Sequence, residues 1–278
     1  YLSIILFFDS MWNLPMILLR ANEKPIPYVA LSILNVILAM ALNIFFVLNM
    51  DKGIWGVFLA NIISSGIIFF ITLPIIVPYL NIRLVNLKLL KNVLKFSMPF
   101  LPAGIFTMIM ELSDRYLLEW FLGTSSVGIY SSGKKLGMLG LITIMGFNMG
   151  WTPYFLKRGK SAGASLEFAK ISTFFIGIIG FINLIIILWI PEIIRFEIFG
   201  KTLIGSEFWS CEPIIKAILF GYFFFGLYVL QLPGIYIKEI TIWIPIFRAI
   251  GAFIMILSSV ILIPYFGIIG AAYSMVLA

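Results

Sequence analysis

The chain has 278 residues, of which 62% are hydrophobic and only 11% are charged. A soluble domain carries about 25% charged residues, so this chain has too few to cover a water-facing surface. It has no histidine and one cysteine, Cys211, which excludes histidine-based catalysis, histidine-ligated metal sites and internal disulfides. The net charge of +7 indicates basic loops beside a membrane rather than a nucleic-acid partner.

Apolar residues come in runs of about 20, the length that crosses a bilayer core as an α-helix. The sequence therefore predicts an all-α, polytopic membrane protein. Because the chain starts at an apolar Tyr1 and stops at Ala278 inside an apolar run, we expect a fragment of a longer protein. We predict eight complete spans and a truncated ninth, at about 1–19, 26–48, 53–75, 96–120, 127–151, 171–190, 213–234 and 241–263, then from 267 to the end.

Lysines and arginines are unevenly distributed over the connections between these spans. One set of alternate connections holds eleven of them and the other set holds four. Basic loops stay on the cytoplasmic side, so we expect the first set to be cytoplasmic in a multi-pass protein of the plasma (inner) membrane. The remaining four cations fall within predicted spans and are Arg115, Lys134, Lys135 and Arg248.

Segment 83–95, RLVNLKLLKNVLK, differs from the spans. Lys88, Lys91 and Lys95 recur at helical spacing, and leucines recur in the same way one step away. This pattern predicts an amphipathic helix on the cytoplasmic membrane surface that links two lobes, although an ordinary basic loop fits it equally well.

Two distant stretches of the chain are similar. GIWGVFLANII at 53–63 and GIIGAAYSMVL at 267–277 both begin Gly-x-x-Gly, and each follows a lysine by 29 residues. The copies lie six predicted helices apart, which keeps them in the same orientation. We therefore expect a two-lobed bundle of parallel six-helix repeats, a plan found among transporters. Chance remains the alternative, because Gly-x-x-Gly is frequent in transmembrane helices.

The span at 96–120 carries an unusual group of charges. Glu111, Asp114 and Arg115 share one helical face, and Glu111 precedes Arg115 by four residues, the favourable order for an ion pair. Each charge turned to lipid costs about 2.5–3.5 kcal/mol, so this face must look inward. Lys134 and Lys135 reach a similar depth on the next span.

These charges have two interpretations. The residues either neutralise one another and lock a helical hairpin, or they line a hydrated cavity between lobes, with spare positive charge for an anionic substrate. The cost argument also turns Asp9 inward in the first span. No nucleophile or metal-ligand set accompanies the carboxylates, so we do not expect an enzyme, a cofactor or a bound metal.

At this point the sequence resembles a known family. FSMPFLPAG, SDRYLLEWFLG, VGIYSSGKKLG and WTPYFLK are similar to the polysaccharide biosynthesis and O-antigen flippase branch of the multidrug/oligosaccharidyl-lipid/polysaccharide exporter superfamily. The resemblance covers nearly the whole chain and implies two six-helix lobes. We expect residues 1–82 to be the C-terminal part of the first lobe, 83–95 the linker, and 96–278 the second lobe.

The resemblance also implies a function. Relatives move an oligosaccharide linked to a polyprenyl phosphate or pyrophosphate, such as an O-antigen, capsule or teichoic repeat unit, to the outer leaflet by alternating access. Arg115, Lys135 and Lys134 would meet the phosphates or acidic sugars, with Lys135 as the better match to the family lysine. Arg248 is a further candidate for this contact.

The acids and the partners follow from the same resemblance. Asp114, Glu111 and Asp9 would hold the cations or couple transport to Na⁺, H⁺ or the membrane potential. Expected partners are membrane lipids and a glycan polymerase or glycosyltransferase. The alternatives are a multidrug and toxin extrusion antiporter, whose cavity would be acidic, and a membrane enzyme of envelope polysaccharide synthesis.

Overall fold

The computed structural model describes residues 1–80, 86–198, 201–202 and 204–278. It divides into two compact units, Tyr1–Leu87 and Lys88–Ala278. The division falls inside the segment predicted as a linker, of which residues 83–85 lie outside the described residues.

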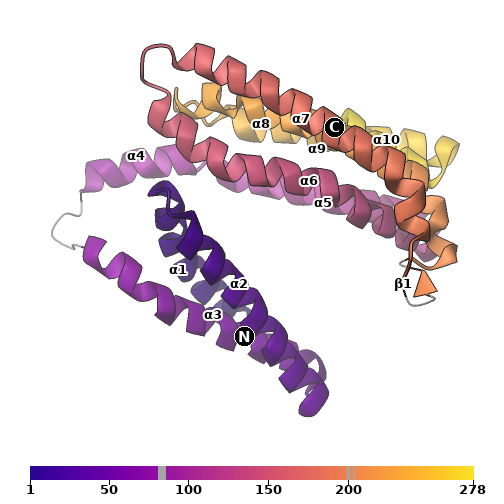
Figure 1. Ribbon diagram of the computed structural model, residues 1–278, viewed down its shortest axis with the longest axis horizontal. Helices are drawn as coiled ribbons and strands as arrows, with labels where there is room; N and C mark the ends of the chain where they lie inside the picture. Colours follow the sequence, from indigo (N-terminus) through magenta and orange to yellow (C-terminus); the bar gives the residue numbers. More distant parts are fainter. Residues whose placement is uncertain (81–85, 199–200, 203) are drawn as a thin grey trace. The chain divides into compact units, whose positions relative to one another are not determined.

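In the first unit, α3 packs against both α1 and α2 (Figure 1, indigo to purple). This packing uses small residues on α3, among them the buried Ala60, Ser64 and Gly66. The elements of this unit are α1 (Leu2–Ala21), α2 (Pro25–Asn43), the π-helical η1 (Ile44–Asn49), α3 (Gly53–Ile76) and the 3-10 turn η2 (Val77–Tyr79).

The second unit is a bundle in which α8 contacts α6, α7 and α10, while α9 contacts α5 and α10 (Figure 1). A hydrophobic core lies between α6, α7 and α8 and includes Trp151, Ile179 and Ile218. The helices of this unit are α4 (Leu87–Ser97), α5 (Phe100–Leu122), α6 (Thr124–Arg158), α7 (Ala164–Arg195), the 3-10 helix η4 (Ser206–Cys211), α8 (Glu212–Tyr236), α9 (Trp243–Phe266) and α10 (Ile268–Leu277).

Strand structure is minimal in the described chain. Only β1 (Glu197–Ile198) and β2 (Lys201–Thr202) pair, antiparallel, with Glu197 opposite Thr202. The prediction of an all-α, polytopic membrane protein is confirmed, because seven helices of the described residues are long and apolar enough to cross a membrane.

The fifth predicted span, 127–151, lies inside α6, which is not among those seven. It forms one continuous 35-residue helix that is less apolar because it carries lysines, serines and several glycines. A helix packed among others does not need a fully apolar surface, since its neighbours shield it from lipid.

The amphipathic segment forms α4, a wholly described helix in which no residue is buried. Its end is fixed to the second unit, because the Thr241 hydroxyl donates to the Phe96 carbonyl at 2.9 Å and the Phe96 ring lies 6.3 Å from that of Tyr236. Pro99 caps α5 and Pro102 lies in its first turn. The two prolines therefore separate α4 from α5, because proline is tolerated in a first helical turn but is disfavoured in a helix interior.

The two Gly-x-x-Gly stretches have the same local structure. Gly53 and Gly267 both have positive φ, at 52° and 65°, and each directly precedes or opens a helix. A Cβ on Gly56 would lie 3.0 Å from the Phe46 backbone, and one on Gly270 would contact the Leu262 backbone. Each copy thus lets a new helix start against the backbone of the preceding one, as the predicted repeat requires.

Candidate functional site

Asp114, on α5, is fully buried and is the centre of a hydrogen-bonded cluster. Its Oδ2 accepts hydrogen bonds from the Lys134 ammonium at 2.5 Å and from the Tyr130 hydroxyl at 2.8 Å. Its Oδ1 accepts the backbone N–H of Arg115 at 2.7 Å. A carboxylate buried in an apolar bundle needs these hydrogen-bond and ion-pair partners, because an unpaired buried charge is strongly unfavourable.

Lys134 joins α6 to α5. Besides the ion pair with Asp114, its ammonium donates to the Glu111 carbonyl at 3.3 Å and lies 5.8 Å from the centre of the Tyr130 ring. Tyr130 and Lys134 are four residues apart and therefore share one face of α6. The predicted pairing of Asp114 with a lysine across the hairpin is present, and Lys134 is the lysine that forms it.

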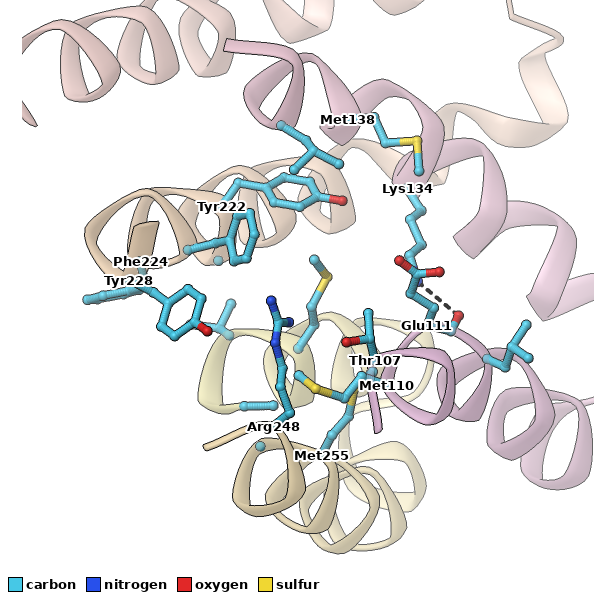
Figure 2. Close-up of a pocket in the computed structure, with 18 of the residues that line it drawn as sticks. Thr107, Met110, Glu111, Lys134, Met138, Tyr222, Phe224, Tyr228, Arg248 and Met255 are labelled. Atoms are coloured by element: carbon cyan, nitrogen blue, oxygen red, sulfur yellow. Dashed lines mark hydrogen bonds between the residues drawn. The ribbon is translucent and has the colours of Figure 1, made fainter. Parts of the chain in front are cut away.

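A pocket of about 490 Å³ opens beside this cluster, inside the second unit (Figure 2). Glu111, Arg115, Lys134 and Arg248 line it, from α5, α6 and α9. These four groups are three cations and one acid, and with the Asp114 carboxylate that is paired with Lys134 the formal charge of the site is +3 − 2 = +1. Lys134 is paired with Asp114, which leaves Arg115 and Arg248 as the cations available to a ligand.

Arg248 projects from α9 into the pocket in Figure 2, beside Tyr228. Its guanidinium lies 5.2 Å from the centre of the Tyr228 ring and 5.7 Å from that of Phe225. An arginine over an aromatic face keeps its in-plane N–H groups free to donate, so these rings orient the guanidinium without neutralising it.

Glu111 and Arg115 do not form the ion pair that their spacing favours. Among the described residues, neither has an oppositely charged side chain within 4.0 Å. Both are exposed and line the pocket.

Lys135 is placed differently from the prediction. Its side chain is exposed, and it does not belong to the described lining of the pocket. The physical reason is the turn of about 100° between adjacent helical residues: α6 directs Lys134 toward Asp114, and Lys135 is thereby directed elsewhere.

Asp9 belongs to the first unit and is not among the residues that line this pocket. Its Oδ1 accepts hydrogen bonds from the Ser65 hydroxyl at 2.6 Å and from the Trp12 indole N–H at 3.1 Å. It therefore faces α3, as the cost of exposing a charge to lipid requires.

Sequence reasoning missed Tyr130 and the aromatic side of the pocket. Tyr130 is fully buried, and its hydroxyl is one of the three donors to Asp114. The signal was its position four residues before Lys134. Tyr222 and Tyr228 had no comparable signal, because their span contains many aromatic residues at several helical faces.

A family model described as polysaccharide biosynthesis protein matches residues 1–158, which is more than half of the 278 residues. The chain belongs to this family. The match includes the whole cluster around Asp114 and the α5 and α6 sides of the pocket. A comparison with curated proteins finds no match.

Two solved transporters have a similar fold. An Asp-to-Asn variant of the MATE transporter VcmN from Vibrio cholerae aligns with a TM-score of 0.79 at 16% identity, covering 98% of this chain and 63% of its own. A proline-to-alanine variant of a MATE protein aligns with a TM-score of 0.75 at 17% identity, covering 99% and 64%. The chain therefore spans less than two thirds of the length of either transporter.

Proposed function

We propose that the protein is part of an exporter that moves a polyprenyl-linked oligosaccharide to the outer leaflet by alternating access. The observation that carries this proposal is a pocket inside a bundle of apolar helices in which two arginines, Arg115 and Arg248, outnumber the one unpaired acid, Glu111. In such surroundings a cation attracts an anion far more strongly than in water, so a phosphate-bearing ligand is favoured. The family description, polysaccharide biosynthesis protein, supports a glycan as the transported group.

The proposed function also implies where the protein is located and which enzymes act before and after it. The uneven distribution of lysine and arginine supports an inner-membrane protein with its basic loops in the cytoplasm. A glycosyltransferase would supply the lipid-linked substrate, and a polymerase would use it on the other side. The protein itself would catalyse no covalent step, and coupling to an ion or to the membrane potential would drive the transport.

A MATE-type antiporter of organic cations is the second candidate, favoured by the fold of the two solved transporters. Arg115 and Arg248 argue against it, because two unpaired guanidinium groups in an apolar pocket repel a cationic ligand.

Reconstituted vesicles separate the two candidates. The full-length protein is placed in vesicles whose inner leaflet carries a labelled lipid-linked oligosaccharide, and a membrane-impermeant glycosidase measures how much label reaches the outside. We expect the protein to expose the label, and we expect no uptake of an organic cation driven by a proton or sodium gradient. Cation uptake without exposure of the glycan would support the antiporter instead.

A further inference from the structure

The helix α4 directly precedes α5, the first helix of the second unit that crosses the membrane. Together they form an apolar stretch of 36 residues, Leu87–Leu122. The 23 residues of α5 alone rise about 34 Å, which already exceeds the hydrocarbon core of about 30 Å. The 11 residues of α4 are therefore not needed for the crossing, and Pro99 separates them from it. This places α4 at the edge of the bilayer rather than inside it.

One side of α4 is basic and the other side is apolar. At about 100° per residue, its three lysines fall within an arc of about 60°. The opposite side carries four apolar side chains that are 48–60% exposed, and no residue of α4 is buried. The lysines are Lys88, Lys91 and Lys95, and the apolar residues are Leu89, Leu90, Val93 and Leu94. A helix of a soluble protein buries its apolar side against its own core, and α4 leaves this side open.

The charge and the open apolar side together favour one kind of partner. The sequence has no acidic residue between Asp51 and Glu111, so α4 carries no acid of its own and attracts an anionic surface. An acidic protein would pair with the lysines and leave the apolar side exposed to water. The surface of an anionic bilayer satisfies both sides, because apolar side chains enter the acyl boundary while lysines extend to the phosphates.

We propose that α4 binds anionic phospholipid headgroups at the membrane surface, with its lysines on the phosphates and its leucines and valine in the acyl boundary. Each lysine close to an anionic surface strengthens attachment by about fivefold, so three of them make α4 selective for anionic over zwitterionic lipid. The inference requires only that the protein spans a membrane and does not depend on the substrate proposed above.

The C-terminal end of α4 is fixed to helices that form the pocket. The hydroxyl of Thr241, between α8 and α9, donates to the Phe96 carbonyl at 2.9 Å. The Tyr236 ring of α8 lies 6.3 Å from the Phe96 ring and 5.9 Å from the Phe100 ring of α5. Because α5, α8 and α9 all contribute lining residues, headgroup binding at α4 holds the shared end of these pocket helices at the membrane surface.

Lipid binding to the full-length protein in detergent, counted by native mass spectrometry, tests the proposal. The probes are phosphatidylglycerol and phosphatidylcholine with the same acyl chains, and glycerol 3-phosphate as the headgroup without a lipid. We expect phosphatidylglycerol to bind at least about tenfold more tightly than phosphatidylcholine, since three lysines contribute to the difference. Glycerol 3-phosphate should not displace it, because it offers nothing to the apolar side of α4.

Variants assign this binding to α4. The triple variant Lys88→Gln/Lys91→Gln/Lys95→Gln should weaken phosphatidylglycerol binding by at least about tenfold. Leu90→Gln/Leu94→Gln keeps every charge and should also weaken it, by at least about fivefold, because the apolar side no longer enters the membrane. The matched control, Lys160→Gln/Lys170→Gln/Lys238→Gln, removes the same charge from exposed positions outside α4 and should leave binding unchanged. All these side chains are exposed, so thermal unfolding should stay the same.

A fluorescent dye on α4 in nanodiscs that contain phosphatidylglycerol measures how the helix lies. Cys211 is buried, so an introduced exposed cysteine takes the dye in its place. We expect lipids with brominated acyl chains to quench a dye on Val93→Cys, on the apolar side, more strongly than a dye on Asn92→Cys, beside the lysines. Equal quenching, or no quenching at either position because protein covers the helix, would overturn the inference.

Three binding results would also overturn it. These are equal affinity for the two phospholipids, displacement of phosphatidylglycerol by glycerol 3-phosphate, and equal weakening by the α4 lysine variant and the matched control. The last result would mean that positive charge on any loop attracts the lipid and that α4 has no special part. None of these measurements involves the transported substrate, so their outcome is independent of the proposed function.

Discussion

The carboxylate of Asp114 has no exposed surface and accepts hydrogen bonds from Lys134, Tyr130 and the Arg115 backbone. These contacts make Lys134 a structural cation that holds α6 against α5. The positive charge available to a ligand then comes from Arg115 and Arg248, whose guanidinium groups line the pocket.

The structural role of this ion pair can be tested with a double-mutant cycle. We expect Asp114→Asn or Lys134→Met alone to lower the free energy of unfolding by about 3–5 kcal/mol, because each leaves one buried charge without its partner. The double variant should recover most of this loss. Thermal unfolding in detergent measures all three, and an additive double variant would show that the two side chains act independently.

Lys135→Gln is the matched control, since it neutralises the adjacent lysine. Its side chain is exposed and has no buried acid to leave unpaired, so we expect the substitution not to lower the free energy of unfolding. A loss as large as that of Lys134→Met would mean that Lys135, the lysine that best matches the family motif, carries the structural role instead.

At this scale, the sequence was sufficient to predict that the charges face inward and that Asp114 meets a lysine across a hairpin. It was not sufficient to choose between Lys134 and Lys135. The choice depends on the rotation of α6 about its own axis. The packing of α6 on α8 fixes that rotation, and the local sequence Gly133-Lys134-Lys135 does not reveal it. The sequence also could not predict that Glu111 and Arg115 do not form an ion pair, because their spacing permits an ion pair without requiring one.

Among the secondary-structure elements, the contact between α6 and α8 sets the rotation of α6 about its own axis. Gly133, Gly137 and Gly140 on α6 face Ile214, Ile218 and Leu219 on α8. A Cβ on Gly137 would lie 2.5 Å from Cγ2 of Ile218, closer than real atoms approach. These glycines therefore allow α6 to pack closely against α8.

We expect Gly137→Ala to destabilise the protein by about 1–3 kcal/mol, because the added methyl group overpacks the contact and pushes α6 away from α8. The shift should also weaken the Lys134–Asp114 pair. Thermal unfolding in detergent measures the loss.

Gly146→Ala is the control on the same helix. A Cβ at Gly146 meets nothing within 4 Å, so the substitution adds helix propensity without a clash and should not lower stability. Equal behaviour of the two variants would contradict the close-packing account.

The presence of each long helix could be predicted from the sequence, but the residues at which the helices begin and end were harder to predict. The spans correspond to α1, α2, α3, α5, α6, α7, α8 and α9, because long apolar runs carry a strong signal. The length of α6 was underestimated: its polar ends, Thr124 and Arg158, lie beyond the apolar run that defined the span.

For the whole molecule, the Gly-x-x-Gly repeat was the most informative sequence signal. Gly56 and Gly270 occupy equivalent positions in α3 and α10, each against the backbone of the preceding helix. The proposed lipid-linked substrate had no such signal in the residues, since the sign of the charge favours an anion without identifying which one.

We propose that Arg115 and Arg248 bind the anionic group of a lipid-linked substrate while the protein moves it across the membrane. The most direct test of this proposal is the initial rate of glycan exposure in vesicles that contain equal amounts of the wild-type full-length protein or the Arg115→Gln/Arg248→Gln double variant. The account predicts a rate at least about tenfold lower for the double variant, as expected when charge-assisted contacts to phosphate are lost, with unchanged thermal stability. A wild-type rate from the double variant would contradict it.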